Sequence, residues 1–152
     1  MFADLPTCRT GDCDPRLTVP ASGGPVYAEV VRRDAKLRRL YRSADGTSWQ
    51  RVTGVDAVPS GWLGPVTAFV TADGTYVTGE ATTPRDQEPV RVRFWASRGD
   101  GEPFTQVVLS GLPSTVLSVR QAKDGWLYAL SYPDGALYGS TDGWHWSAVT
   151  TR

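Results

Sequence analysis

The sequence predicts an all-β protein that is built from three similar units. Its 152 residues include 16 Gly and 11 Pro, which favour many turns, and six Trp, which suit short and well-packed strands. A pattern of strand, tight turn and strand occurs three times, with turn glycines about 50 residues apart at Gly24, Gly74 and Gly125. Each of these patterns is followed by a strand that ends in serine. The chain is long enough for one domain with a real core.

Each unit begins with a predicted hairpin. Residues 17–30 align without a gap with residues 117–130, and residues 68–79 have the same shape. The second and third hairpins turn at Asp-Gly, which is a strong hairpin signal because type I′ turns need positive φ. We therefore expect two antiparallel strands at the start of every unit.

A third and a fourth strand complete each unit. The third strands end in serine and cover residues 40–43, 94–97 and 137–140. A turn with Asp and Gly follows, and an aromatic residue then opens the fourth strands, at residues 48–54, 103–109 and 145–150. Each unit is thus a four-stranded antiparallel meander of about 40–50 residues, the size of a propeller blade.

The third strands are apolar on both faces. One face carries Leu40, Phe94 and Leu137, and the other carries Tyr41, Trp95 and Tyr138. Such strands must be covered on both faces, as a blade between two neighbours is. We expect a tail over residues 1–16 and then three blades in residues 17–152, at about 17–54, 66–110 and 115–151.

Three blades make an incomplete propeller, because closed propellers typically have 4–8. The terminal blades would then expose large apolar faces, which isolated soluble proteins avoid. We expect self-association of the chain, or additional blades from another chain. A third interpretation is that the sequence is a fragment of a longer propeller.

The turn between the third and fourth strands carries a recurring motif. Residues 40–49 read LYRSADGTSW and residues 137–146 read LYGSTDGWHW, so both contain S-x-D-G-x-x-W. The middle copy has one additional residue and has Phe in place of Trp. Over residues 17–150, the chain resembles the Asp-box (BNR) repeats of sialidase-like and sortilin-type β-propellers. The usual box, S-x-D-x-G-x-T-W, is one residue longer than the two good copies.

The residue types of the box have a structural purpose. Asp accepts hydrogen bonds from N–H groups of its own turn, Gly adopts a conformation that other residues avoid, and Trp packs between sheets. We therefore interpret the boxes as fold-making rather than catalytic. Their residues are Ser43, Asp45, Gly46, Trp49, Ser97, Asp100, Gly101, Phe104, Ser140, Asp142, Gly143 and Trp146.

No catalytic set can be assigned. Sialidases of the family that the chain resembles use an arginine triad, a Tyr nucleophile with a Glu partner, and an Asp acid/base. The family's Arg-Ile-Pro segment is absent, and residues 15–20 echo it only faintly. Glu29 and Glu80 come near the ends of second strands, but the sequence assigns neither a tyrosine partner. We expect a protein that is not an enzyme, with a subunit or fragment of a glycoside hydrolase as the alternative.

Other chemistry has little support in the sequence. His145 lies inside the third box without a placed nucleophile, and we interpret it as a turn residue. Asp12 and Asp14 offer too few ligands for calcium, so we expect no metal and no cofactor. Cys8 and Cys13 flank a turn-like segment and favour a disulfide. Two reduced cysteines, or less readily a zinc site, are the alternatives.

Charge gives little indication of a nucleic-acid partner. Sixteen basic residues balance sixteen acidic ones, so no global field favours nucleic acid or an anionic membrane. The basic run at residues 32–42 suits an acidic protein surface better. No apolar stretch is long enough for a membrane span, and no signal peptide is present in the chain as given. The cysteine pair favours a secreted or cell-surface location.

Ligand contacts are expected on the longer loops. In sialidase-like relatives, the ligand face carries the loops between strands two and three and between blades. The candidate residues of that face are Trp62, Arg32, Arg33, Arg85 and Tyr132. Trp144 is a further candidate, because the equivalent turn positions hold the polar residues Thr47 and Glu102. The expected function is recognition of a glycan or a protein, with a purely architectural subunit as a further alternative.

Overall fold

The structure is a computed structural model that describes residues 13–20, 23–32, 37–59, 65–83, 89–99 and 101–150. These residues form three four-stranded antiparallel sheets and one short 3-10 turn, η1 (Val55–Ala57). The prediction of an all-β fold with three four-stranded meanders is confirmed.

The strands of each sheet lie side by side in chain order. The first sheet contains β1 (Cys13–Thr18), β2 (Val26–Arg32), β3 (Leu37–Ser43) and β4 (Gln50–Val52). The second contains β5 (Pro65–Val70), β6 (Tyr76–Ala81), β7 (Val92–Ser97) and β8 (Thr105–Val107). The third contains β9 (Val116–Gln121), β10 (Leu127–Ser131), β11 (Leu137–Ser140) and β12 (Ser147–Ala148).

Two element boundaries differ from the expectation. β1 begins at Cys13, within the predicted tail, because its six residues pair with β2 from Cys13 opposite Arg32 to Thr18 opposite Tyr27. The fourth strands are also shorter than predicted, with three, three and two residues. The fourth strand lies at the sheet edge and pairs on one side only. The box turn also takes up residues that the sequence placed in this strand.

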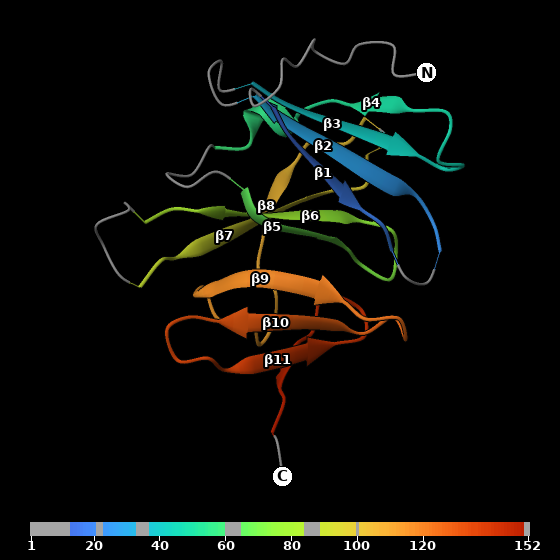
Figure 1. Ribbon diagram of the computed structural model, residues 1–152. Helices are drawn as coiled ribbons and strands as arrows, with labels where there is room; N and C mark the ends of the chain where they lie inside the picture. The colour runs from blue at the N-terminus through green and yellow to red at the C-terminus, as the bar shows by residue number, and fades with distance from the viewer. Residues whose placement is uncertain are drawn as a thin grey trace.

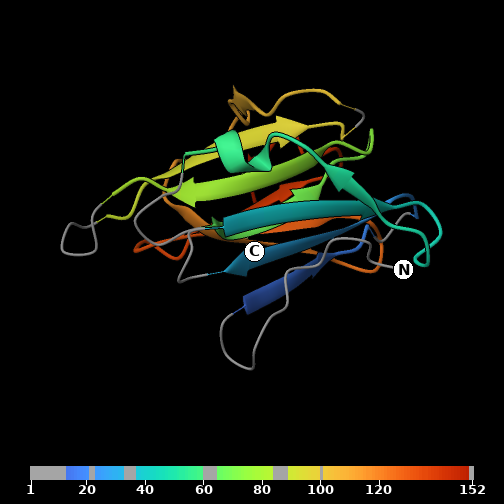
Figure 2. The ribbon, with the colours of Figure 1, turned by 90° about the horizontal axis from the view of Figure 1, so that it is seen from above.

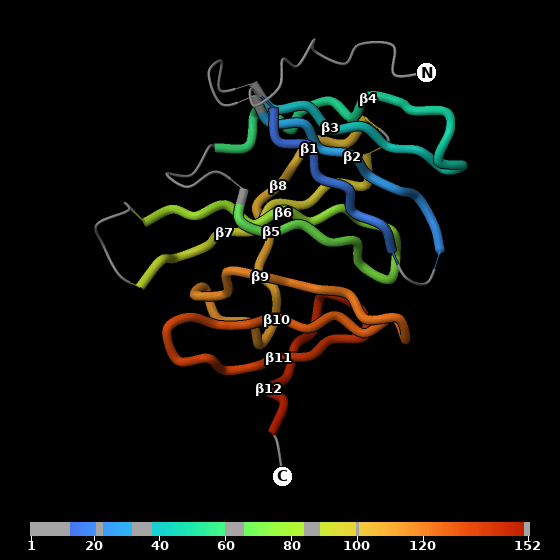
Figure 3. Tube along the Cα trace, in the orientation of Figure 1, coloured from blue at the N-terminus to red at the C-terminus, as the bar shows by residue number. Residues whose placement is uncertain are grey.

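The three sheets are blades of an incomplete propeller. Figure 1 shows them stacked in order from β1–β4 through β5–β8 to β9–β11, and the trace in Figure 3 follows the same succession. Seen from above, they lie over one another with their strands in roughly similar directions (Figure 2). The first strands of neighbouring blades meet, since the Val119 N–H on β9 donates to Thr67 Oγ1 on β5 at 2.9 Å.

Each interface between blades has its own apolar core. Tyr27 and Leu40 of the first blade pack with Val70 and Tyr76 of the second, and the Tyr27 and Tyr76 rings lie 4.9 Å apart. The core between the second and third blades contains Phe69, Val77, Val92, Phe94, Ala96, Leu109, Val116, Val119, Leu127, Ala129 and Trp146. The middle blade is therefore covered on both faces, as its third strand predicted.

A buried charged cluster also joins the first and second blades. The Arg38 guanidinium on β3 contacts Glu29 on β2, lies 2.5 Å from a carboxylate oxygen of Glu80, and donates to Thr78 Oγ1 at 2.7 Å. The Tyr76 hydroxyl donates to Glu29 at 3.2 Å. The sequence assigned no tyrosine partner to Glu29, and the structure corrects this. All of these side chains are buried, so the Tyr–Glu pair cannot meet a substrate.

Candidate functional site

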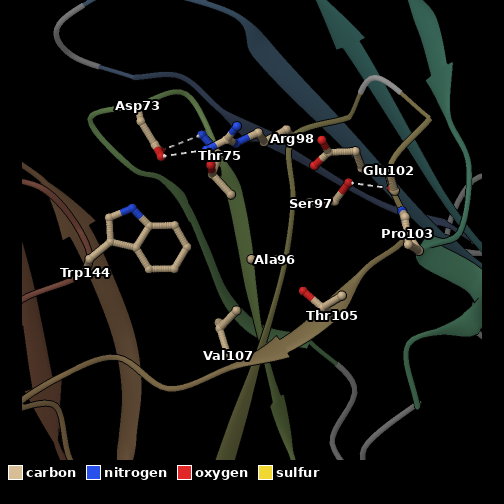
Figure 4. A pocket seen from close by; sticks show the side chains of 10 residues that line it. All are labelled: Asp73, Thr75, Ala96, Ser97, Arg98, Glu102, Pro103, Thr105, Val107 and Trp144. Carbon is tan, nitrogen blue, oxygen red and sulfur yellow. Dashed lines mark hydrogen bonds and ion pairs between the residues drawn. The ribbon is translucent and has the colours of Figure 1, made fainter.

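A cavity of about 270 Å³ opens between the turns of the second and third blades. Figure 4 shows side chains from both blades around it, with Trp144 opposite the strands of the second blade. The described residues that line it are Asp73, Thr75, Ala96, Ser97, Arg98, Glu102, Pro103, Thr105, Val107 and Trp144. One aromatic wall therefore faces a mainly polar one.

The third box places Trp144 at the cavity. Asp142 Oδ1 accepts the backbone N–H groups of Trp144 at 2.7 Å and His145 at 2.8 Å, and the Ser140 hydroxyl accepts the Gly143 N–H at 2.8 Å. The Trp146 indole N–H donates to the Gly143 carbonyl at 3.0 Å. These bonds close the turn, as the residue types of the box predicted.

Neighbouring segments hold the third box in position. The Ser110 N–H donates to the Trp144 carbonyl at 2.9 Å, and the Trp146 N–H donates to the Ser110 carbonyl at 2.8 Å. A β-carbon at Gly111, where φ is +78°, would lie 2.1 Å from the Trp146 carbonyl oxygen, so only glycine fits this approach. The side chain of Trp144 is half-buried and packs against the core between the second and third blades.

The hairpin turn of the second blade supplies the facing carboxylate. The Thr71 hydroxyl and the Thr75 N–H donate to Asp73 Oδ1, the latter at 3.3 Å. Partial burial raises the pKa of Asp73, but hydrogen bonds from Thr71 and Thr75 outweigh it, so the pKa lies below its ordinary value. The Arg98 guanidinium lies 3.8 Å from Asp73 Oδ2 and remains largely exposed. Asp73 is therefore an ionised acceptor at neutral pH.

The pKa of Asp73 differs from that of a glycosidase general acid. A glycosidase needs one carboxylic acid whose pKa is raised, so that it can protonate the leaving group. The pKa of Asp73 moves in the opposite direction. Among the described residues, no group of three His, Cys, Asp or Glu side chains could hold a metal ion.

His145 forms an exposed pair with Asp142. Its Nδ1 lies 2.7 Å from Asp142 Oδ2 at the surface of the third box. Within the described part of the chain, the ring has no hydrogen bond to a serine or cysteine side chain. The pair thus belongs to the turn, as the sequence interpretation had it.

The first box has the same turn geometry as the third. Asp45 Oδ1 accepts the N–H groups of Thr47 and Ser48, and the Ser43 hydroxyl accepts the Gly46 N–H at 2.8 Å. In the second box, the Ser97 hydroxyl donates to the Glu102 carbonyl at 2.9 Å. Asp100 lies outside the described residues. Trp49 packs against the cluster of Ala28, Val30 and Tyr41 in the first blade. Phe104 packs edge-on against Tyr76.

The candidate ligand residues from the sequence fall into two groups. Trp62, Arg33, Arg85 and Cys8 lie outside the described residues, as does the side chain of Arg32, so the ligand face and the Cys8–Cys13 disulfide stay predictions. Tyr132 is exposed, and its N–H donates to the Thr115 carbonyl at 3.1 Å, away from the cavity. Of the candidates among the described residues, Trp144 lines the cavity and Tyr132 does not.

Three residues of the cavity were not predicted from the sequence: Asp73, Thr75 and Arg98. A signal for the first two was present, because Thr71-Ala72-Asp73-Gly74 has the same Ser/Thr-x-Asp-Gly order as the boxes. The Ala72 N–H donates to the Asp142 carbonyl at 3.0 Å, which brings this hairpin turn onto the third box. This contact joins two blades, and no local sequence pattern predicts it.

Comparison with known proteins gives similarity of structure only. No family model matches the chain, and no curated protein matches it. Solved structures that resemble it include a glycosyl hydrolase from Bacteroides ovatus, at 16% identity and a TM-score of 0.44 over 92% of this chain and 49% of that one. A putative glycosidase from Bacteroides thetaiotaomicron shows 20% identity and 0.45 over 92% and 50%. An alpha-L-arabinofuranosidase from Fusarium graminearum shows 17% and 0.44 over 93% and 48%.

The chain thus spans about half the length of each of these structures. None of the described residues forms a helix with the length and hydropathy of a membrane span.

Replacing Asp142 with alanine is expected to lower the free energy of unfolding by about 1–2 kcal/mol at neutral pH, because turn N–H groups lose their acceptor. Partial burial raises the pKa of Asp142, but bonds from His145, Trp144 and Ser140 outweigh it and lower the pKa. Because its pKa is lower in the folded state, ionised Asp142 stabilises the folded protein at pH values above the ordinary pKa of 3.8. This contribution to stability is lost as the pH falls through the pKa of the folded state. Thermal unfolding at neutral and acidic pH measures both effects.

The gap in melting temperature between the wild type and Asp142→Ala should narrow at acidic pH. Asp134→Ala is the matched control, since among the described residues Asp134 accepts one long hydrogen bond, from the Ala136 N–H at 3.4 Å. Equal stability of Asp142→Ala and the wild type at neutral pH would show that the box carboxylate does not hold the turn.

Proposed function

We propose that the chain is a non-catalytic carbohydrate-binding module whose ligand occupies the cavity beside Trp144. One observation carries this proposal: a half-buried indole lines a cavity whose other wall supplies hydrogen-bonding side chains from the neighbouring blade. The motif and turn geometry of the boxes further support a relationship to Asp-box propellers of the sialidase-like type.

A sugar ring matches the two walls of the cavity. Its C–H face can stack on an indole, while its hydroxyl groups donate to carboxylates and accept from a guanidinium. Trp144 supplies the first kind of contact, and Asp73, Glu102 and Arg98 supply the second. The volume of about 270 Å³ lies just below the usual range of about 300–1,000 Å³ for ligand pockets, which favours one sugar unit over a larger ligand.

A glycan ligand also implies where the protein acts and which partners it meets. Glycans are found outside the cell and on its surface, which agrees with the secreted or cell-surface location that the sequence favours. Glycans attached to proteins would also bring a protein partner to the same site. The proposal requires no cofactor and no nucleic acid.

Trp144→Thr is expected to weaken glycan binding at least tenfold, or about 1.4 kcal/mol. A glycan array identifies the ligand of the wild type, and titration calorimetry with that ligand compares the variants. Arg98→Ala should also weaken binding, and because Arg98 is largely exposed, it should leave the melting temperature nearly unchanged. Trp144 is half-buried, so Trp144→Thr is expected to cost stability as well.

Tyr132→Ala tests the face that the sequence analysis favoured and should leave binding unchanged. Loss of binding in Tyr132→Ala with full binding in Trp144→Thr and Arg98→Ala would contradict the proposed site. Hydrolysis of a fluorogenic sialoside or other glycoside by the purified chain would instead support the glycoside hydrolase alternative.

A further inference from the structure

The box turns of two adjacent blades each contribute one side chain to the cavity. Glu102 comes directly after Gly101 of the second box, and Trp144 comes directly after Gly143 of the third. Both side chains line the cavity, one from each blade (Figure 4). The Ser97 hydroxyl donates to the Glu102 carbonyl at 2.9 Å, which fixes the backbone of Glu102 in its turn. The repeat thus places a carboxylate and an indole around the same space.

The guanidinium of the cavity already has a counter-charge. Arg98 Nη2 lies 3.8 Å from Oδ2 of the ionised Asp73, and Figure 4 shows the guanidinium directed toward that carboxylate. Arg98 can still donate to a sugar hydroxyl, but its positive charge is balanced within the cavity. A carboxylate on a ligand therefore meets no uncompensated cation among the described residues of the lining.

Glu102 supplies a negative charge that is not balanced in this way. Its side chain is exposed and forms no ion pair with a residue that the structure describes. The described part of the lining thus holds two carboxylates and one guanidinium, so its formal charge is negative. Asp142 accepts the Trp144 N–H at 2.7 Å and adds a further carboxylate on the turn that carries the indole.

The indole of Trp144 adds an attraction for positive charge. Burial raises the pKa of Asp73, and a side-chain hydrogen bond from Trp144 is one of several that lower it, so the indole lies beside this carboxylate. The face of an indole attracts a cation within about 6 Å of its centre, more strongly than other aromatic rings do. An indole and an unbalanced carboxylate together favour a positively charged group over a neutral hydroxyl.

We propose that the sugar bound in this cavity carries a protonated amine, so that the site selects a hexosamine with a free amino group over neutral and acidic sugars. The ammonium group can lie against Glu102 while the C–H face of the same ring stacks on Trp144 and its hydroxyl groups accept from Arg98. This inference rests on the proposed carbohydrate site and adds the charge of its ligand. Sialic acid, whose carboxylate is bound by an arginine triad in the enzymes that the chain resembles, is expected to be a poor ligand.

Titrations with four related sugars, followed in proton–nitrogen correlation spectra, test the charge preference. D-Glucosamine is a cation, D-glucose and N-acetyl-D-glucosamine are neutral, and D-glucuronic acid is an anion. At neutral pH and low salt, glucosamine is expected to bind about fivefold more tightly than either neutral sugar, and glucuronic acid should bind most weakly. Added salt should reduce this preference, because it screens the exposed charge of Glu102.

Glu102→Gln keeps the size of the side chain and removes its charge. It should reduce the preference for glucosamine over glucose to less than about twofold. Because Glu102 is exposed, the melting temperature should stay nearly unchanged. Asp134→Asn is the matched control, since it removes one negative charge from the segment between β10 and β11, outside the lining of the cavity. The preference of this control should equal that of the wild type.

The outcomes separate this inference from the carbohydrate site itself. Equal affinity for glucose and glucosamine, or a preference that Glu102→Gln leaves intact, would overturn the charge selection alone. Butylammonium carries the charge without a sugar ring, and if it bound as tightly as glucosamine, the site would recognise a lysine-like amine rather than an amino sugar. Binding of none of the four sugars would contradict the carbohydrate site together with this inference.

Discussion

Replacing Arg38 with methionine is expected to lower the free energy of unfolding by about 3–5 kcal/mol, the usual cost of removing one partner from a buried ion pair. Arg38 is 6% exposed and is shared by the carboxylates of Glu29 and Glu80. Without the guanidinium, two buried carboxylates face each other across the interface between the first and second blades. The free-energy cost of these unpaired charges therefore destabilises the packing between the two blades rather than one strand.

The pKa values in this cluster support the same expectation. Burial lowers the pKa of Arg38, but the attraction of Glu29 and Glu80 outweighs it, so the pKa lies above its ordinary value and the group stays charged. Burial and the charge of Glu29 raise the pKa of Tyr76, which keeps its hydroxyl protonated as the donor to Glu29. In this cluster, the single positive charge of Arg38 is thus shared between the negative charges of Glu29 and Glu80.

Urea denaturation measures the effect of Arg38→Met. Arg51→Met is the matched control, because Arg51 lies exposed on β4 of the same blade and should change stability by no more than about 0.5 kcal/mol. The deficit of Arg38→Met should shrink at acidic pH, where protonation removes the unpaired carboxylate charges. A deficit below about 1 kcal/mol at neutral pH would mean that the cluster does not hold the blades together.

The second large effect is expected for Trp146→Ala, at about 3–5 kcal/mol. Trp146 is 5% exposed and packs edge-on against Phe69 of the second blade, with ring centroids 5.9 Å apart. Its indole N–H also closes the third box by donating to the Gly143 carbonyl. The substitution therefore removes core volume between the second and third blades and one turn bond together.

Trp126→Ala is the control for Trp146→Ala. Trp126 belongs to the same blade, but it is 42% exposed and lies outside the core between the second and third blades, so its loss leaves no buried cavity. Thermal unfolding compares the two variants at a protein concentration where both are monomeric. Equal destabilisation by the two substitutions would contradict the assignment of Trp146 to the core.

Short-range patterns in the sequence were sufficient to predict the blades. Gly74 and Gly125 adopt positive φ in their turns, and the third strands end at Ser43, Ser97 and Ser140 as expected. The sequence could also distinguish two tryptophans that are two residues apart. Trp146 occupies the box position that packs between sheets, whereas Trp144 occupies a position that polar residues fill in the other boxes.

Contacts between blades could not be predicted in the same way. Arg38 meets Thr78 and Glu80 of the next blade, and Asp73 lies at the same cavity as Trp144, far along the chain. Such contacts depend on how the sheets stack, and the alternation within one strand does not determine this. The third blade shows the same limit, because Leu137 fits the apolar pattern of the third strands but remains exposed.

The indole N–H signals in a proton–nitrogen correlation spectrum test the carbohydrate site most directly. The chain has six tryptophans, and the spectrum of Trp144→Thr identifies the signal of Trp144. Titration with the glycan that the array selects should shift the Trp144 signal progressively, while the signal of Trp126, which does not line the cavity, stays in place. Saturable binding of that glycan with an unchanged Trp144 signal would contradict the account and place the ligand elsewhere on the propeller.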